Sequence, residues 1–290
     1  MPSPPRGAVP LADAVALLSR HLRGDAPGFL LVVTGAGVSA ASGLATFRGP
    51  EPEAVWRQDD VRIATREYLE ADPAGHWRWF LDRFSGVLEA RPNAGHRALA
   101  SIETWQAARG GGFLLLTQNV DTLHEQAGSR RLVKVHGTAD RLRCSRVGCA
   151  LGSPEGSIPR EEVDLRPFLA APRRENVPAC PLCSSPLRPH ALLFDEFYDE
   201  HRDYRFDETQ RAARSADRVV TVGTSHSVGV THLVLREALG RGAPVVSVDP
   251  HAAGAPAGVV HLPLPAEELL PRCAAHLAGG PASRAVRAEG

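Results

Sequence analysis

The sequence predicts an α/β fold, in which a doubly wound, mostly parallel sheet carries a smaller second domain formed by two insertions. Residues 29–33 form a continuous apolar run rich in β-branched side chains, as expected for a strand buried on both faces. Later apolar runs alternate with helical patterns, and this alternation is typical of a parallel sheet. The later runs predicted to be strands are 112–117, 131–135, 218–223, 244–249 and 258–264.

The composition excludes some classes of protein. The 33 acidic and 33 basic residues cancel, which argues against a broad electrostatic surface for nucleic acid. We expect no membrane span, because no run of about 18 apolar residues occurs. The N-terminal residues lack the apolar core of a signal peptide, so we expect a cytoplasmic protein. The oligomeric state stays open.

An amphipathic helix is predicted at 11–23, before the first strand. Two later stretches depart from the strand–helix rhythm: one has helical patterning and the other carries cysteine pairs. We expect these two insertions to pack together as the smaller domain. The predicted boundaries are 1–49, 98–138 and 191–278 for the sheet domain, 50–97 and 139–190 for the helical and cysteine-bearing insertions, and 279–290 for a flexible tail.

A glycine turn follows the first predicted strand. A strand, a glycine turn and a helix start aim backbone N–H groups at a phosphate, and Gly35, Gly37 and Ala40 fit the dinucleotide-binding pattern. Many α/β turns carry glycine for tight backbone geometry alone, so that alternative stays open. No acidic residue ends a second strand about 20 positions further on, as recognition of the ribose in dehydrogenases requires.

Polar residues follow the next two strands. Gln118, Asn119 and Asp121 offer the donors and acceptors that would read an amide, although Asn119 or Asp121 could simply cap the following turn. His136 ends the next strand, and an imidazole with an ordinary pKa of about 6.5 can accept a proton near neutral pH. A lone histidine at a strand end is more often structural, so this alternative also stays open.

Two further strands end in residues suited to the adenosine half of a dinucleotide. Gly223, Thr224 and Ser225 follow the fourth strand, and Asp249 follows the fifth. Because the carboxyl ends of parallel strands share one edge of a sheet, we expect one crevice to collect these residues.

Four cysteines form two close pairs. Cys144 and Cys149 are separated by 30 residues from Cys180 and Cys183, and two such pairs supply four thiolates for a closed, tetrahedral, structural zinc site. The alternative is four reduced core thiols. Cys273 lies on an apolar helix and is expected in the core.

Taken in order, these motifs resemble the sirtuins of bacterial type, which are NAD-dependent protein-lysine deacylases. The resemblance spans about residues 28–265 and includes the stretch from Gly35 to Arg48, the Gln-Asn-Val-Asp-Thr-Leu-His run at 118–124 and the His-Gly pair at 136–137. It implies a Rossmann-like NAD-binding domain, structural zinc, and acylated-lysine proteins or peptides as substrates.

The resemblance also implies roles for single residues. His136 and Asn119 would be catalytic: after the acyl oxygen attacks C1′ of the NAD ribose and nicotinamide leaves, His136 helps to deprotonate a ribose hydroxyl. The products would be lysine, nicotinamide and an O-acyl-ADP-ribose. Asp249 stands where the family usually has asparagine. The implied NAD-binding residues are Gly35, Ala36, Gly37, Ser39, Phe47, Arg48, Gln118, Asn119, Asp121, Gly223, Thr224, Ser225 and Asp249.

The segment 188–196 resembles the family's substrate-binding strand, which implies peptide contacts for Leu193, Phe194 and Val228. Asp195 replaces the usual glycine.

Residues 77–98 are similar to the branch that removes acidic acyl groups, with Arg83 at its arginine place but Phe80 at its tyrosine place. Deacetylation is therefore the default expectation, and removal of succinyl or malonyl groups through Arg83 is one alternative. The others are an NAD hydrolase or ADP-ribosyltransferase, and a zinc-binding interaction module without catalysis.

Overall fold

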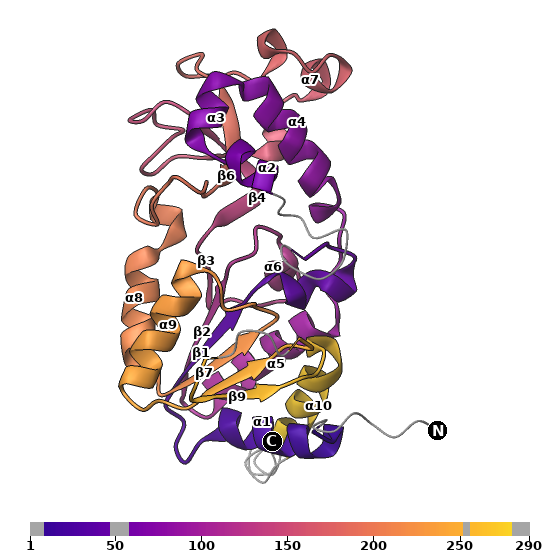
Figure 1. Cartoon of the computed structure of the whole chain (residues 1–290), viewed down its shortest axis with the longest axis vertical. Coiled ribbons are helices and arrows are strands. Elements are labelled where there is room, and N and C mark those ends of the chain that lie inside the picture. Colours follow the sequence, from indigo (N-terminus) through magenta and orange to yellow (C-terminus); the bar gives the residue numbers. More distant parts are fainter. Residues whose placement is uncertain (1–8, 47–57, 252–255, 280–290) are drawn as a thin grey trace, which may run out of the picture.

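The computed structural model describes residues 9–46, 58–251 and 256–279. Its main sheet has six strands in the order β3-β2-β1-β7-β8-β9, and every neighbouring pair is parallel. This order doubles back at β1, so that the chain moves to one edge through β2 and β3 and later to the other edge (Figure 1). The strands are β1 (Phe29–Thr34), β2 (Gly112–Thr117), β3 (Leu132–Lys134), β7 (Arg218–Val222), β8 (Val245–Val248) and β9 (Val259–Leu262).

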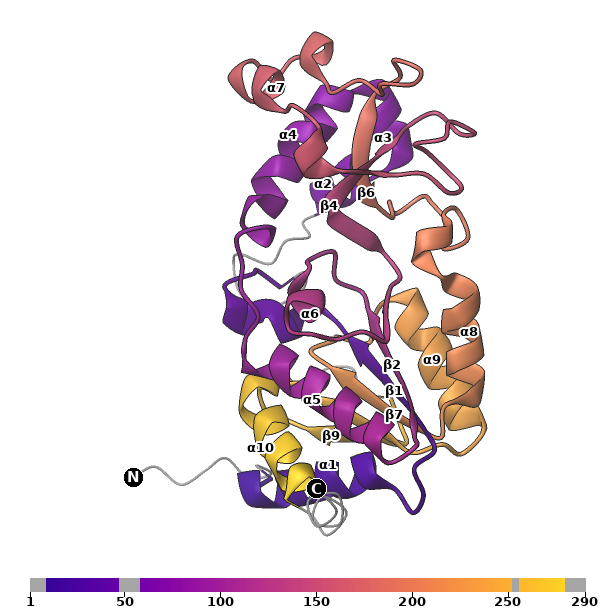
Figure 2. The ribbon, with the colours of Figure 1, turned by 180° about the vertical axis from the view of Figure 1, so that it is seen from behind.

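Helices cover both faces of this sheet (Figures 1 and 2). On β1, Leu30 and Val32 point into a core shared with α1, α5 and α10, whereas Leu31 and Val33 point into a core shared with α8 and α9. This alternation explains why the strand is apolar throughout, because both of its faces are buried. The covering helices are α1 (Leu11–Arg23), α5 (Ala94–Ala108), α8 (Phe206–Ser215), α9 (Gly229–Gly240) and α10 (Ala266–Ala278).

A second, antiparallel sheet lies beyond the carboxyl edge of the first, in the upper part of Figure 1. It consists of β4 (Gly137–Cys144) between β5 (Ile158–Pro159) and β6 (Leu187–Ala191). Trp77 of α4 (Pro73–Phe84) packs in its core and donates its indole N–H to the Leu187 carbonyl at 2.8 Å. Residues from both predicted insertions thus share one core, while the domain boundaries themselves stay predictions.

Short helices complete the described chain. The α-helices are α2 (Gln58–Ile63), α3 (Arg66–Ala71), α6 (Leu123–Gln126) and α7 (Arg166–Ala170). The 3₁₀ segments are η1 (Ala36–Ser42), η2 (Ser85–Val87), η3 (Arg160–Glu162), η4 (Arg174–Asn176) and η5 (Arg202–Tyr204). No helix in the described ranges combines the length and apolar character needed to cross a bilayer.

The fold class predicted from sequence is confirmed. The predicted helix at 11–23 has the bounds of α1, and all six predicted strands form within two residues of their expected ends. The segment after the glycine turn is a 3₁₀ helix, although its start suggested an ordinary helix.

Candidate active site

The turns after β1 and β7 cross each other backbone to backbone. Gly35 N–H donates to the Val222 carbonyl at 3.0 Å, and Gly37 N–H donates to the Gly223 carbonyl at 2.9 Å. A Cβ on Gly37 would lie 2.7 Å from the Cα of Gly223, so neither turn has room for a side chain there. The two amides expected to face a phosphate are therefore engaged by carbonyls, and these glycines allow close approach of the backbones.

Asn93, just before α5, holds the 3₁₀ segment η1 in place. Its Nδ2 donates to the Val38 carbonyl at 2.8 Å and to Ser42 Oγ at 3.1 Å, while its Oδ1 caps α5 by accepting from Gly95 N–H at 2.8 Å. One asparagine thus fixes both a helix start and the turn beside it. Asn93 lies within residues 77–98, but the sequence did not reveal this contact.

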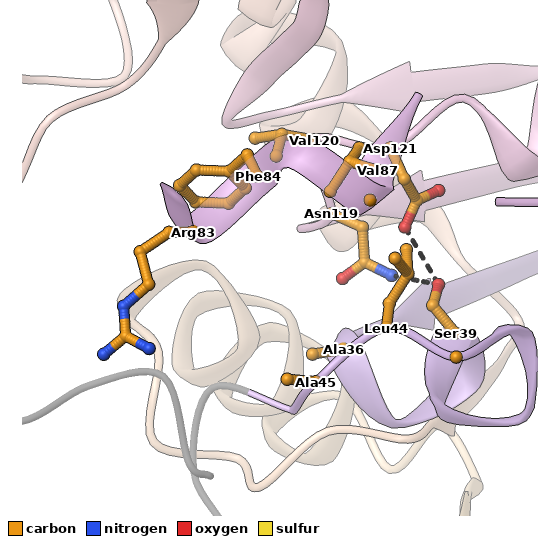
Figure 3. Close-up of a pocket in the computed structure, with 12 residues that line it drawn as sticks. Ala36, Ser39, Leu44, Ala45, Arg83, Phe84, Val87, Asn119, Val120 and Asp121 are labelled. Atoms are coloured by element: carbon orange, nitrogen blue, oxygen red, sulfur yellow. Dashed lines mark hydrogen bonds between the residues drawn. The ribbon is translucent and has the colours of Figure 1, made fainter. Parts of the chain in front are cut away.

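A pocket of about 210 Å³ opens where η1 faces the segment after β2 (Figure 3). Asn119 Nδ2 donates to the Gly35 carbonyl at 3.1 Å and to Ser39 Oγ at 3.2 Å, and Ser39 Oγ donates to Asp121 Oδ2 at 2.9 Å. Asn119 Oδ1 is buried and accepts no hydrogen bond from the described residues. The pocket therefore holds an oriented amide with its acceptor unused. Its lining also includes Ala36, Gly43, Leu44, Ala45, Arg83, Phe84, Gly86, Val87 and Val120.

The capping interpretation of this polar run holds for Asp121. Asp121 Oδ1 accepts from Leu123 N–H at 3.0 Å at the start of α6, so Asp121 supports a turn with one oxygen and Ser39 with the other. The Asn119 side chain makes no such cap; its amide donates instead to η1 and the residue before it.

Neutral histidines lie behind the pocket. His96 Nε2 is 3.4 Å from Ser39 Oγ, and its ring centroid is 4.8 Å from that of His124. Burial lowers the pKa of His96 to about 4 and that of His124 well below its usual range. Both rings are therefore uncharged at neutral pH and contact hydroxyl partners, Ser39 for His96 and Thr34 for His124.

His136 lies just after β3, and its imidazole contacts the segment that follows β2. Its Nδ1 lies 2.8 Å from the Gln118 carbonyl, which can only accept, so Nδ1 carries the hydrogen and Nε2 the lone pair. Burial lowers the pKa of His136 below 6.5, against the opposite effect of the Gln118 hydrogen bond. This tautomer and charge suit a group that accepts a proton through Nε2.

The turn after β7 contacts the same edge. Thr224 Oγ1 lies 3.4 Å from Gln118 Nε2, which links the second and fourth predicted site segments. His226, which the sequence did not single out, is buried with Nε2 at 3.0 Å from Thr221 Oγ1. Ser225 is exposed, and Asp249 Oδ1 accepts from His251 N–H at 2.8 Å. Phe47 and Arg48 lie outside the described residues.

The four paired cysteines converge beside β4. The sulfurs of Cys144 and Cys183 are 3.5 Å apart, those of Cys149 and Cys180 are 3.7 Å apart, and all four lie within 4.8 Å of one another. Tetrahedral zinc with bonds of about 2.3 Å would separate its sulfurs by about 3.8 Å. The donor set and its spacing fit a closed structural zinc site.

Comparison with known proteins decides the family. The model of the Sir2 family matches residues 35–230, which is more than half of the chain. The chain belongs to the Sir2 family of NAD-dependent protein deacylases. An NAD-dependent protein deacylase of Thermus thermophilus is 38% identical over 220 residues, covering 76% of this chain and 78% of that protein.

Solved Sir2 structures have the same fold. A Sir2 homologue in complex with NAD aligns with a TM-score of 0.71 and 29% identity, over 90% of this chain and 93% of that one. A Sir2–p53 peptide–NAD⁺ complex aligns with a TM-score of 0.68 and 25% identity, over 86% of this chain and 92% of that one. The family, the deacylase class, the Rossmann-like sheet, NAD as co-substrate and a four-cysteine site consistent with zinc are thereby confirmed.

The segment after β6 in this Sir2 chain is anchored by two acidic residues. Asp195, at the usual glycine place, accepts from Arg66 N–H at 2.7 Å and Glu67 N–H at 3.2 Å, and so holds the start of α3. Glu196 is buried and pairs with Arg188 at 2.5 Å and Arg143 at 3.1 Å. Leu193 is buried, Phe194 is half exposed, and Val228 precedes α9.

The two residues considered for acyl recognition have different environments. Arg83 lines the pocket, on its far side from Asp121 in Figure 3. Phe80 is 2% exposed, stacks on Phe84 with centroids 4.8 Å apart, and belongs to a core cluster with Val87. Phe84 and Val87, which the sequence did not single out, line the pocket where Phe80 does not.

A second cluster of possible metal ligands in this Sir2 chain has surroundings that disfavour a metal ion. His190, His201 and Asp203 lie within 4.8 Å of one another. However, the charges of Arg141, Arg143 and Arg188 act on these groups and oppose a cation among them. His201 Nδ1 also accepts from Asp203 N–H at 3.2 Å.

The single lysine, Lys134, lies at the end of β3. Its Nζ is 2.9 Å from Glu125 Oε1 and donates to Thr138 Oγ1 at 2.7 Å, and its side chain is 13% exposed.

Proposed function

We propose that this Sir2-family chain removes acetyl groups from lysine side chains of proteins or peptides, with His136 as proton acceptor and Asn119 as the amide that positions the nucleotide. One observation carries the assignment of residues. Asn119 lines the pocket with its side-chain Oδ1 free of hydrogen bonds to described residues, and the main-chain carbonyl of the preceding residue, Gln118, accepts a hydrogen bond from His136 Nδ1.

NAD supplies the ribose carbon that receives the acyl oxygen and the nicotinamide that leaves. The protein supplies orientation and a base. Ser39 and Asp121 hold each other and Asn119 in one geometry, so little freedom is lost when the nucleotide binds. His136, neutral and with its lone pair on Nε2, takes the proton of a ribose hydroxyl.

The experiment combines an acetyl-lysine peptide, NAD and the purified chain, and follows the products by mass spectrometry. We expect deacetylated peptide, nicotinamide and O-acetyl-ADP-ribose in equal amounts. Release of nicotinamide without peptide would instead favour an NAD hydrolase, and no release under any condition would favour the zinc interaction module.

His136→Ala tests the proposed base. We expect turnover to fall by about 10²-fold or more while NAD still binds, because the base is lost but the pocket is kept. His232→Ala, at an exposed position on α9, is the matched control and should be fully active. Equal turnover in both variants would remove His136 from the mechanism.

Removal of an acidic acyl group is the second candidate, because Arg83 lines the pocket and a guanidinium can bind a carboxylate through two hydrogen bonds.

The cytoplasmic location also stays a proposal. It is supported by the zinc-like thiol cluster, since such sites are typical of reducing compartments.

A further inference from the structure

Tyr198, on the segment after β6, stacks on the proposed base. Its ring lies nearly parallel to that of His136, with centroids 5.7 Å apart and planes at 21°. It also stacks on Phe206 at the start of α8, with centroids 4.8 Å apart and planes at 14°. The tyrosine therefore links the imidazole to the helical layer of the main sheet.

The Tyr198 hydroxyl has two polar neighbours. Its oxygen lies 3.4 Å from His136 Nε2, and the nearby backbone N–H of Val230 opposes the effect of burial on the Tyr198 pKa. Val230 is the second residue of α9, so its N–H has no acceptor within the helix. Because an amide N–H can only donate, the oxygen offers its lone pairs to this group and its hydrogen to Nε2.

The protonation of His136 agrees with this direction. Nδ1 donates to the Gln118 carbonyl, which leaves the lone pair on Nε2 to accept from Tyr198. The hydrogen-bonded chain thus runs from the Tyr198 hydroxyl through the imidazole to the Gln118 carbonyl. Burial raises the pKa of Tyr198, which keeps the phenol protonated and able to donate.

We propose that Tyr198 is a positioning residue of the deacylation reaction, whose hydroxyl holds His136 in the Nδ1–H tautomer and sets its basicity until a ribose hydroxyl of NAD takes its place at Nε2. The proposal rests on the function proposed above. A bond donated to neutral imidazole stabilises the neutral form, so it lowers the pKa of His136 in the same direction as burial. Tyr198 is the titratable side chain that faces the ring, and no charged side chain of the described segments acts on the pKa of His136.

Tyr198→Phe removes the hydroxyl and keeps the stacked ring. We expect the pKa of His136 to rise by about 0.5 to 1 unit, and the acidic limb of the kcat/KM profile to move to higher pH by the same amount. The pKa is read from ¹⁵N-histidine NMR titration of the full chain, with His136 assigned by its missing signals in His136→Ala. Phe206→Leu is the matched control, since it removes a stacking partner of Tyr198 and keeps the hydroxyl.

The two readouts separate this proposal from the proposed function. An unchanged His136 pKa in Tyr198→Phe, or an equal shift in Phe206→Leu, would overturn the proposal. A shifted pKa with an unmoved acidic limb would also overturn it, because the hydroxyl would then have no part in the reaction. If the wild-type chain shows no NAD-dependent deacylation, the proposed function fails, whereas the NMR titration still decides whether Tyr198 controls the imidazole.

Discussion

Gly37 and Gly223 touch through their main chains, with the amide of the first donating to the carbonyl of the second at 2.9 Å. Gly223 has a φ of +59°, and a Cβ there would lie 2.3 Å from the Val38 nitrogen. The carboxyl ends of β1 and β7 are therefore held together at the place where the order of strands reverses, which is the usual position of a nucleotide in such sheets.

Gly223→Ala should be severely destabilising. It combines left-handed backbone strain of about 1–2 kcal/mol with a clash against backbone. Gly43→Ala is the control, because Gly43 also has a positive φ, of +82°, but nothing within 4 Å of its Cβ position. Urea unfolding should show a loss at Gly223 larger than the loss at Gly43 by about 1–3 kcal/mol. Similar losses would mean that the two turns can separate without cost.

Cys180→Ser should abolish zinc binding. One of four thiolates is lost, and a closed structural site contributes directly to folding stability. We expect one zinc per wild-type chain by elemental analysis, none in the variant, and a lower thermal midpoint. Cys273→Ser changes a buried cysteine outside the cluster and should retain the metal. A zinc-free wild-type chain of full stability would contradict the assignment.

Glu196→Gln should cost about 3–5 kcal/mol, since it removes the carboxylate that pairs directly with two buried guanidinium groups. Burial opposes ionisation of Glu196, but the charges of Arg188 and Arg143 lower its pKa to about 2. A carboxyl with a lowered pKa stabilises the fold above its unfolded value of 4.5, and this stability is lost as pH falls toward 2. Glu200→Gln, which breaks a more exposed pair with Arg66 at 2.6 Å, should cost under about 1 kcal/mol in the same assay.

Arg83→Met tests the acyl preference. If Arg83 reads a carboxylate, kcat/KM for succinyl-lysine peptide should fall by about 10-fold or more, with acetyl-lysine little changed. Arg78→Met on the same helix is the control, because Arg78 donates to the Pro172 carbonyl at 3.0 Å and does not line the pocket. An equal fall in kcat/KM for both peptides would mean that Arg83 supports the structure of the pocket and does not read the acyl group.

Acid should destabilise the chain progressively below about pH 6.5. Burial lowers the pKa of His76 and of His96 to about 4, whereas both have values of 6.5 when unfolded. Between these values the unfolded chain binds more protons, so the stability that these two histidines contribute is fully present above pH 6.5 and is lost as pH drops toward 4. His76→Asn can preserve the donor to the Ile63 carbonyl, and urea midpoints should then depend less on pH.

The main sheet could be predicted from sequence because its signals are local. Runs such as 29–33 are apolar on both faces, and glycines and cysteines mark turns and ligand pairs whatever surrounds them. The sequence predicted that the amides of Gly35 and Gly37 would face a phosphate. Only the fold shows that these amides donate to the carbonyls of Val222 and Gly223.

Contacts between distant segments were beyond the reach of the sequence pattern. Asp195 looked like a departure from the family, yet it caps α3 through two backbone amides. Tyr198 gave no periodic or motif signal, because its importance depends on where β6 and α9 bring it. Phe80 fitted an alignment place, but it is packed under Phe84 one turn away on the same helix face, so Phe84 and not Phe80 lines the pocket.

Lys134 gives this deacylase an unusual practical property. With one ε-amine in the chain, and that one in an ion pair with Glu125, the protein offers almost nothing for chemical acylation by thioesters or acyl phosphates. It is thus a poor substrate for itself. In a proteolytic digest of its reaction mixture, nearly all acyl-lysine peptides would therefore come from the protein substrate and not from the enzyme.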